Sequence, residues 1–144
     1  MRDAGGMRGL SNGAPSTWLV RILSVVFIGL GLLFLVAPHS GATLFGIAAP
    51  GGEGSGYLPA IGLRDLAFGL YLLILSATAT RRTLGLILAA TLVIPIGDII
   101  IVTAARGSDA ALNLLLHGAS AAVMAAGSVW LLRISGHDKT GGQS

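Results

Sequence analysis

The sequence predicts an all-α fold: a polytopic membrane protein whose four transmembrane helices form an antiparallel bundle. Only 10% of the 144 residues are charged and 53% are hydrophobic, whereas soluble globular chains carry about 25% charged residues. Four apolar stretches of about 20 residues each take up most of the chain, and each is long enough to cross a hydrocarbon core about 30 Å thick. Basic residues gather at the ends of these stretches, as is typical of membrane spans.

Net charge and the lack of cysteine narrow the classes of function. The net charge is only +3, and the basic residues are not interleaved with aromatic residues as in a nucleic-acid-binding surface. The expected partner is therefore the lipid bilayer and not a nucleic acid. The chain has no cysteine, which excludes disulfides, thiolate metal sites and cysteine nucleophiles. A metal site is a weak alternative because no paired-histidine spacing is present, and no cofactor is expected.

The first span is expected at residues 18–37, after a polar tail at residues 1–17. Its apolar stretch is longer than the 7 to 15 residues typical of the apolar region of a signal peptide, so we expect it to remain as a span. Pro38 ends it. Ser24 and Gly31 lie seven residues apart and so share one face, where small side chains allow another helix to approach closely.

The connection at residues 39–58 is the longest in the chain. Its part at residues 40–48 is apolar enough to lie at the membrane interface as a short amphipathic or re-entrant piece, and a glycine-rich turn segment follows it. The second span is expected at residues 59–80. It ends at Arg81 and Arg82, which are typical of a membrane boundary.

The third span is expected at residues 83–103, so close to the second that the two would form a tight helical hairpin. Pro95 removes a backbone donor from it and predicts a bend about one turn before Asp98. The fourth span is expected at residues 110–132, and residues 134–144 form a polar tail.

The distribution of Lys and Arg predicts the orientation of the transmembrane domain, residues 18–133. Arg106 is the one basic residue near a span end on one side. The others fall on the opposite side, which the positive-inside rule assigns to the cytoplasm. We therefore expect a multi-pass protein of the cell membrane with both tails, residues 1–17 and 134–144, cytoplasmic. The basic residues on the cytoplasmic side are Arg2, Arg8, Arg21, Arg81, Arg82, Arg133 and Lys139.

Two adjacent opposite charges, Arg64 and Asp65, interrupt the second span. A charged residue at a helix centre costs about 2.5 to 3.5 kcal/mol on insertion scales, so an ion pair inside a membrane indicates a functional site. Counted inward from the outer span ends, Arg64, Asp65, Asp98 and His117 all lie about 8 to 10 Å deep at a rise of 1.5 Å per residue. This shared depth predicts that the four side chains form one site.

The four residues are the candidate catalytic groups. Arg64 is expected to hold Asp98 through a two-pronged hydrogen bond. Asp65 is expected to orient one ring nitrogen of His117 and to raise its basicity. The result would be an acid/base site. The structural alternative is a network of the same residues that satisfies its own charges and fixes the register of the helices.

Four further residues are candidates for ligand binding. Asn113 and Ser120 lie on the same stripe of the fourth span as His117. Phe68 and Tyr71 share a face with Arg64 on the second span, and for both the alternative role is packing.

Short motifs lie within residues 62–130: Gly62-Leu63-Arg64-Asp65 followed by Gly69, Arg81-Arg82, Pro95, Gly97-Asp98 and His117-Gly118. With these motifs the chain resembles a family of small four-helix integral membrane proteins of unknown function from bacteria and fungi, and it is also loosely similar to DoxX-like four-helix membrane proteins. The resemblance implies a four-helix membrane fold with a shared polar site, and it implies no activity.

Three classes of function fit these features. The first is a membrane-embedded enzyme that performs acid/base chemistry on a lipophilic small molecule. It would be epoxide-hydrolase-like, with Asp98 activating a water that Arg64 positions and with Asp65 or His117 donating a proton, or isomerase-like. The second is a proton- or cation-coupled transporter or ligand-binding protein, for which four helices are few, so a homodimer is expected. The third is a structural accessory subunit with a self-satisfied polar core.

Overall fold

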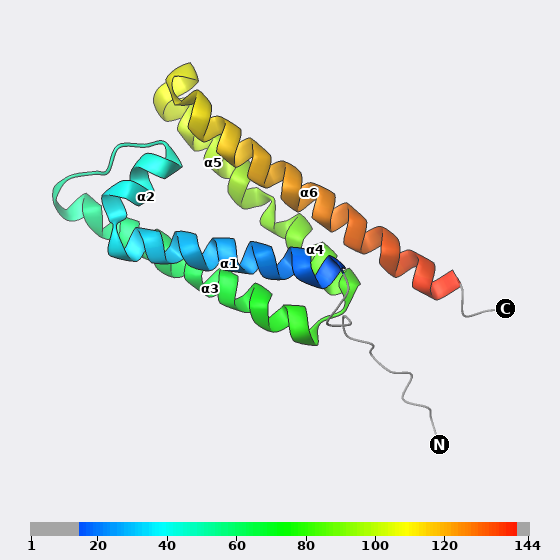
Figure 1. Ribbon diagram of the computed structural model, residues 1–144. Helices are drawn as coiled ribbons and strands as arrows, with labels where there is room; N and C mark the ends of the chain where they lie inside the picture. The colour runs from blue at the N-terminus through cyan, green and yellow to red at the C-terminus, as the bar shows by residue number, and fades with distance from the viewer. Residues whose placement is uncertain (1–14, 141–144) are drawn as a thin grey trace.

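The computed structural model describes residues 15–140, which form helices and short connections (Figure 1). The all-α prediction is confirmed. Residues 1–14 and 141–144, which belong to the predicted tails, lie outside the described residues. The elements are α1 (Pro15–Val36), α2 (Pro38–Phe45), η1 (Gly52–Gly56), α3 (Tyr57–Thr78), α4 (Arg81–Thr91), α5 (Val93–Arg106), η2 (Gly107–Ala110) and α6 (Ala111–Thr140).

Three helical stretches are long and apolar enough to cross a membrane: Pro15–Val36, Gly52–Thr78 and Arg81–Ser135. The third stretch contains both the third and the fourth predicted spans. It reverses direction at η2, so that α6 returns alongside α5 and α4 (Figure 1).

The helices pack as two antiparallel pairs that meet at one end and diverge toward the other (Figure 1). α1 packs along α3, and α4 with α5 packs along α6. Although only Ala79 and Thr80 connect α3 to α4, these two helices diverge from their turn. The predicted tight hairpin is therefore wrong. α3 and α4 pack against other helices instead of against each other. Gly69 of α3 lies against α1, and Gly85 of α4 lies against α6.

Small residues bring α1 and α3 into backbone contact. A Cβ atom added to Gly31 would lie 2.6 Å from the backbone nitrogen of Leu66 and 2.7 Å from the carbonyl oxygen of Gly62. The hydroxyl of Ser24 donates a 2.7 Å hydrogen bond to the carbonyl of Gly69. The prediction that Ser24 and Gly31 form a close helix contact is confirmed.

In the second pair, α4 and α6 also approach closely through a serine and a glycine. Ser128 of α6 donates a 2.8 Å hydrogen bond to the carbonyl of Gly85 in α4. A Cβ atom at Gly85 would lie 2.8 Å from the Leu132 side chain and 3.2 Å from the Ser128 carbonyl. Each pair is thus held by a serine on one helix and a glycine on the other, which allows the close backbone approach typical of helices in lipid.

The long third stretch is interrupted at Leu92, between α4 and α5. Pro95 has no backbone N–H, and its ring crowds the carbonyl four residues earlier, at Thr91. The backbone responds with a tighter turn in which Leu92 N–H bonds the Ala89 carbonyl at 3.2 Å. The interruption lies before Asp98, in the region where the sequence predicts a bend.

The core lies mainly where the two pairs meet. Apolar side chains from α1, α3, α4 and α6 fill this end, and all of them are buried: Val20, Phe27, Leu72, Leu84, Leu88, Met124 and Leu131. At the other end, a smaller cluster of Phe34, Ala42 and Leu58 fixes α2 to α1 and α3. α2 therefore lies at the wide end of the wedge between the two pairs (Figure 1).

Candidate functional site

A cavity of about 280 Å³ lies in the wedge between the two pairs of helices. Most of its walls are aliphatic and aromatic side chains from α1, α2, α3, α5 and α6. Arg64, Asp65, Asp98, His117 and Ser120 add polar groups. The volume is close to the lower end of the range of about 300 to 1,000 Å³ for small-molecule sites, and the mixture of apolar walls with few polar groups is typical of such sites.

Arg64 and Asp65 form an ion pair on α3. Both Nε and Nη2 of Arg64 donate hydrogen bonds of 3.0 Å to the same carboxylate oxygen, Oδ1 of Asp65. Asp65 is buried because it shares the inward face of α3 with Gly62, Gly69 and Ser76, as the spacing predicts. The Arg64 side chain lies at the edge of this face and is 51% exposed.

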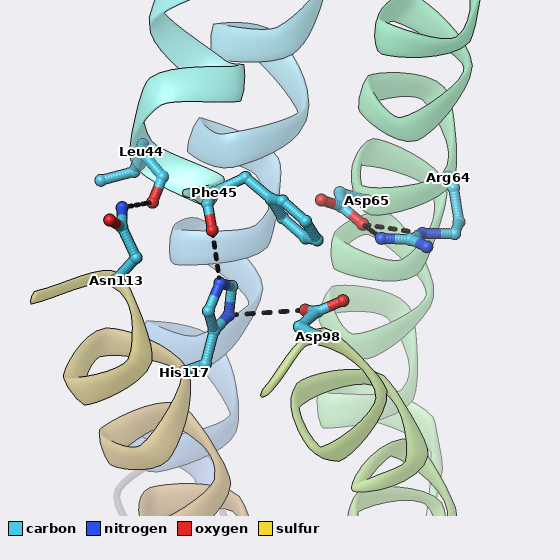
Figure 2. A network of polar contacts seen from close by, with 7 residues as sticks. All are labelled: Leu44, Phe45, Arg64, Asp65, Asp98, Asn113 and His117. Carbon is cyan, nitrogen blue, oxygen red and sulfur yellow. Dashed lines mark hydrogen bonds and ion pairs between the residues drawn. The ribbon is translucent and has the colours of Figure 1, made fainter. Parts of the chain in front are cut away.

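His117 lies between a backbone carbonyl and a carboxylate (Figure 2). Its Nε2 atom is 2.9 Å from the carbonyl oxygen of Phe45, and a carbonyl only accepts hydrogen bonds, so Nε2 carries a proton and donates it. Its Nδ1 atom is 3.5 Å from Oδ2 of Asp98. A neutral ring would then turn the Nδ1 lone pair toward a carboxylate oxygen. A further proton on either His117 or Asp98 would allow a hydrogen bond between these two acceptors.

The structure places all four predicted catalytic residues on one cavity but pairs them differently from the prediction. Arg64 binds Asp65, not Asp98, and His117 faces Asp98, not Asp65. The reason is the division into helical pairs. Asp98 of α5 and His117 of α6 meet inside one pair, whereas Arg64 belongs to the other pair and its long side chain folds back onto its neighbour in sequence.

Of the predicted ligand-binding residues, Ser120 lines the cavity and the other three lie elsewhere. Asn113 donates hydrogen bonds from Nδ2 to the carbonyls of Thr43 (3.0 Å) and Leu44 (2.8 Å). Phe68 packs edge to face on Phe27, with ring centroids 4.8 Å apart. Tyr71 lies on the outer face of α3 and is 61% exposed. Sharing a helical face with Arg64 does not bring these aromatic rings into the site, because Arg64 itself sits at the edge of the inward face.

The sequence reasoning missed the part played by α2. Its last carbonyls, which no helical N–H satisfies, accept hydrogen bonds from side chains of α5 and α6. Asn113 and His117 supply three of these bonds, and Nη1 of Arg106 bonds the Gly46 carbonyl at 3.3 Å. α2 thus bridges the wide end of the wedge. Gly46, with a φ of 106°, is the one local signal in the sequence, since glycine there is typical of a helix C-terminus.

Metal ligation has no support from the part of the chain that the structure describes. Among the side chains described, those of residues 15–135, no group of three His, Asp or Glu is arranged to hold an ion.

Comparison with known proteins identifies a family but no activity. No curated protein and no solved structure matches the chain. Residues 24–131 match the family described as "Domain of unknown function (DUF4267)". This range contains most of both helical pairs and the four ionisable cavity residues. The match agrees with the resemblance to a small helical family of unknown function and does not support the similarity to DoxX-like proteins. The chain belongs to the DUF4267 family.

Proposed function

We propose that this protein is an integral membrane protein that admits a lipophilic small molecule to the cavity between its helical pairs and performs acid/base chemistry on it. One observation carries the proposal: four ionisable side chains from both helical pairs converge on a cavity whose other walls are apolar. A self-contained polar core would not require a cavity beside it. A ligand with an apolar body and a polar head would fill this one.

The outer surface supports a membrane location. Large aliphatic side chains are exposed on all the long helices, among them Val36, Leu63, Val93 and Leu112. Apolar patches of this extent are rare on soluble monomers, whereas lipid solvates them. Helices are also a form that satisfies its own backbone hydrogen bonds in a bilayer.

The distribution of basic residues supports an orientation with both termini in the cytoplasm. Arg21, Arg81 and Arg133 lie toward the end where the two pairs meet, and Arg106 lies at the opposite end, next to η2. By the positive-inside rule, the end at which the two pairs meet faces the cytoplasm. The cavity and α2 then lie in the outer half of the cell membrane.

The geometry favours an isomerase-like reaction over an epoxide-hydrolase-like one. Arg64 pairs with Asp65 and not with Asp98, so the Arg64–Asp98 contact that the hydrolase-like reaction would use to hold a water is not formed. The Asp98–His117 pair needs no second reactant. It would take a proton from one atom of the ligand and return it to another, which leaves both the pair and the atom count unchanged. Proton transfer by positioned groups of this kind contributes about 10² to 10⁴ in rate.

A structural accessory role is the second candidate. It is favoured by the completeness of the polar contacts: within residues 15–135, no fully buried side-chain nitrogen or oxygen atom lacks a hydrogen-bond partner. A subunit held together by this network would need no ligand. The two candidates differ in whether the cavity is occupied.

Native mass spectrometry of protein released from its own membranes tests the proposal. We expect wild-type protein to carry a bound small molecule. Ile94→Trp should lose it, because Ile94 lines the cavity and the indole fills part of its volume. Ile101→Trp is the matched control, since Ile101 lies on the same helix but is 51% exposed on the outer surface. Wild-type protein without a bound molecule, or an Ile94→Trp variant that keeps it, would contradict the proposal.

A further inference from the structure

The charged groups of the cavity balance one another. Arg64 and Asp65 are joined by two hydrogen bonds of 3.0 Å and contribute +1 and −1. Nδ1 of His117 lies 3.5 Å from Oδ2 of Asp98, while its Nε2 faces the Phe45 carbonyl. With one proton on either Nδ1 or Oδ2, in addition to the Nε2 proton, this pair is neutral overall. The four ionisable groups then sum to zero.

A neutral site of this kind selects against a charged head group. An anionic or cationic head would bring a charge for which the cavity holds no unmatched counter-charge. Transfer of an uncompensated charge from water into a site walled by apolar side chains costs far more than transfer of a neutral polar group. Arg64 and Asp98 are each already matched, so neither is free to act as the counter-ion.

The two carboxylates of the cavity keep one unused acceptor oxygen each, beside the N–H donors of Arg64 that Asp65 does not use. No contact recorded among the described residues uses Oδ2 of Asp65 or Oδ1 of Asp98, and the Ser120 hydroxyl also borders the cavity. In Figure 2 the second oxygen of Asp98 points away from His117, toward the helix that carries Asp65. A head group that only accepts hydrogen bonds, such as an ether, would leave these acceptors without a donor. A hydroxyl both donates and accepts.

We infer that the cavity takes an uncharged lipophile whose head group carries a hydroxyl. This inference rests on the proposed function and names the ligand class of the same site. The apolar body of the ligand would lie among the side chains of α1, α5 and α6. Val26 of α1 and Leu116 of α6 both line the cavity and are 49% and 44% exposed. The cavity therefore reaches the apolar outer surface, and the ligand would enter from lipid.

Four ten-carbon probes that differ in their head groups test the inference. They are 1-decanol, its methyl ether, decylsulfonate and decylammonium. Full-length protein in phosphatidylcholine nanodiscs would be loaded with each probe at the same mole fraction, and native mass spectrometry would give the bound fraction. We expect 1-decanol to bind about tenfold better than each of the others, the size of effect expected for a hydrogen bond to a charged acceptor.

Arg64→Gln should change the charge preference. The substitution removes the guanidinium of the cavity and leaves the Asp65 carboxylate without its counter-ion. Binding of decylammonium relative to 1-decanol should therefore rise about tenfold. Arg64 is half exposed, so the fold should tolerate the change. Arg82→Gln is the control, because Arg82 lies at the start of α4 and not on the cavity, and it should leave the ratio unchanged.

The outcomes separate this inference from the proposed function. Tighter binding of either charged probe to the wild-type protein, equal binding of 1-decanol and its ether, or an unchanged probe ratio in Arg64→Gln would each overturn the hydroxyl-bearing neutral ligand. A native bound molecule that is lost in Ile94→Trp would still support the proposed function in those cases. If neither a probe nor a native molecule binds, both fail.

Discussion

Gly31→Val is expected to separate α1 from α3 and to lower the free energy of unfolding by about 3 kcal/mol, the upper part of the usual range for overpacked helix contacts. The added Cβ would lie 2.6 Å from the Leu66 nitrogen and 2.7 Å from the Gly62 carbonyl oxygen. Both are backbone atoms, which cannot swing aside as a side chain can. The two helices would have to move apart, and the Ser24 to Gly69 hydrogen bond would break with them.

Gly29→Val is the matched control for this prediction. Gly29 lies on the same helix two residues earlier, and nothing lies within 4 Å of the Cβ that it would gain. Both variants carry the same cost of a β-branched residue in a helix, so the difference between them isolates the helix contact. Unfolding in detergent, followed by circular dichroism, measures that difference. Equal stability of the two variants would contradict the close packing of α1 on α3.

Asp98→Asn is expected to keep the fold and to lower proton transfer to the bound molecule about 10² to 10⁴-fold. The amide has the shape of the carboxyl group, and its N–H can donate to Nδ1 of His117, so the contact with α6 persists. It cannot take up a proton at neutral pH, so the acid/base pair is lost. The readout is the incorporation of deuterium from heavy water into the native ligand, followed by mass spectrometry.

Asp109→Asn is the control, because Asp109 lies in η2 and its side chain is outside the cavity. It should retain the wild-type rate of deuterium incorporation. The accessory-subunit candidate requires a different result for Asp98→Asn: a loss of stability with no effect on exchange into a ligand. That outcome would show that the pair only holds α5 to α6.

The local features of the fold could be predicted from the sequence because short-range chemistry determines them. The proline at position 95 interrupts its helix whatever surrounds it, and Ser24 with Gly31 offers a close-packing face whichever helix occupies it. The choice of partner is not local. Gly69 and Gly85 lie close in the sequence, on either side of the turn between α3 and α4, yet they pack against α1 and α6. The sequence alone does not show that the two helices diverge.

The same distinction applies to the site. Depth counting places Arg64, Asp65, Asp98 and His117 at one level of the helices, and the structure brings them to one cavity. Depth does not determine how each helix is rotated or which helices pair, so the prediction from depth exchanges the partners of Arg64 and His117. The acceptor for Nε2 of His117 is the main-chain carbonyl of Phe45. Every residue has a backbone carbonyl, so the residue types do not indicate which carbonyl accepts this hydrogen bond.

The acid/base role proposed for the cavity requires one proton between Asp98 and His117 while Nε2 of His117 donates to the Phe45 carbonyl. The ¹⁵N NMR spectrum of the His117 ring measures it most directly, in lipid-embedded protein carrying His39→Gln and His137→Gln so that one histidine signal remains. We expect a protonated Nε2 in a hydrogen bond and an Nδ1 signal that shifts in Asp98→Asn. An unprotonated Nε2 with the proton on Nδ1 would contradict this arrangement. An Nδ1 chemical shift that is unchanged in Asp98→Asn would also contradict it.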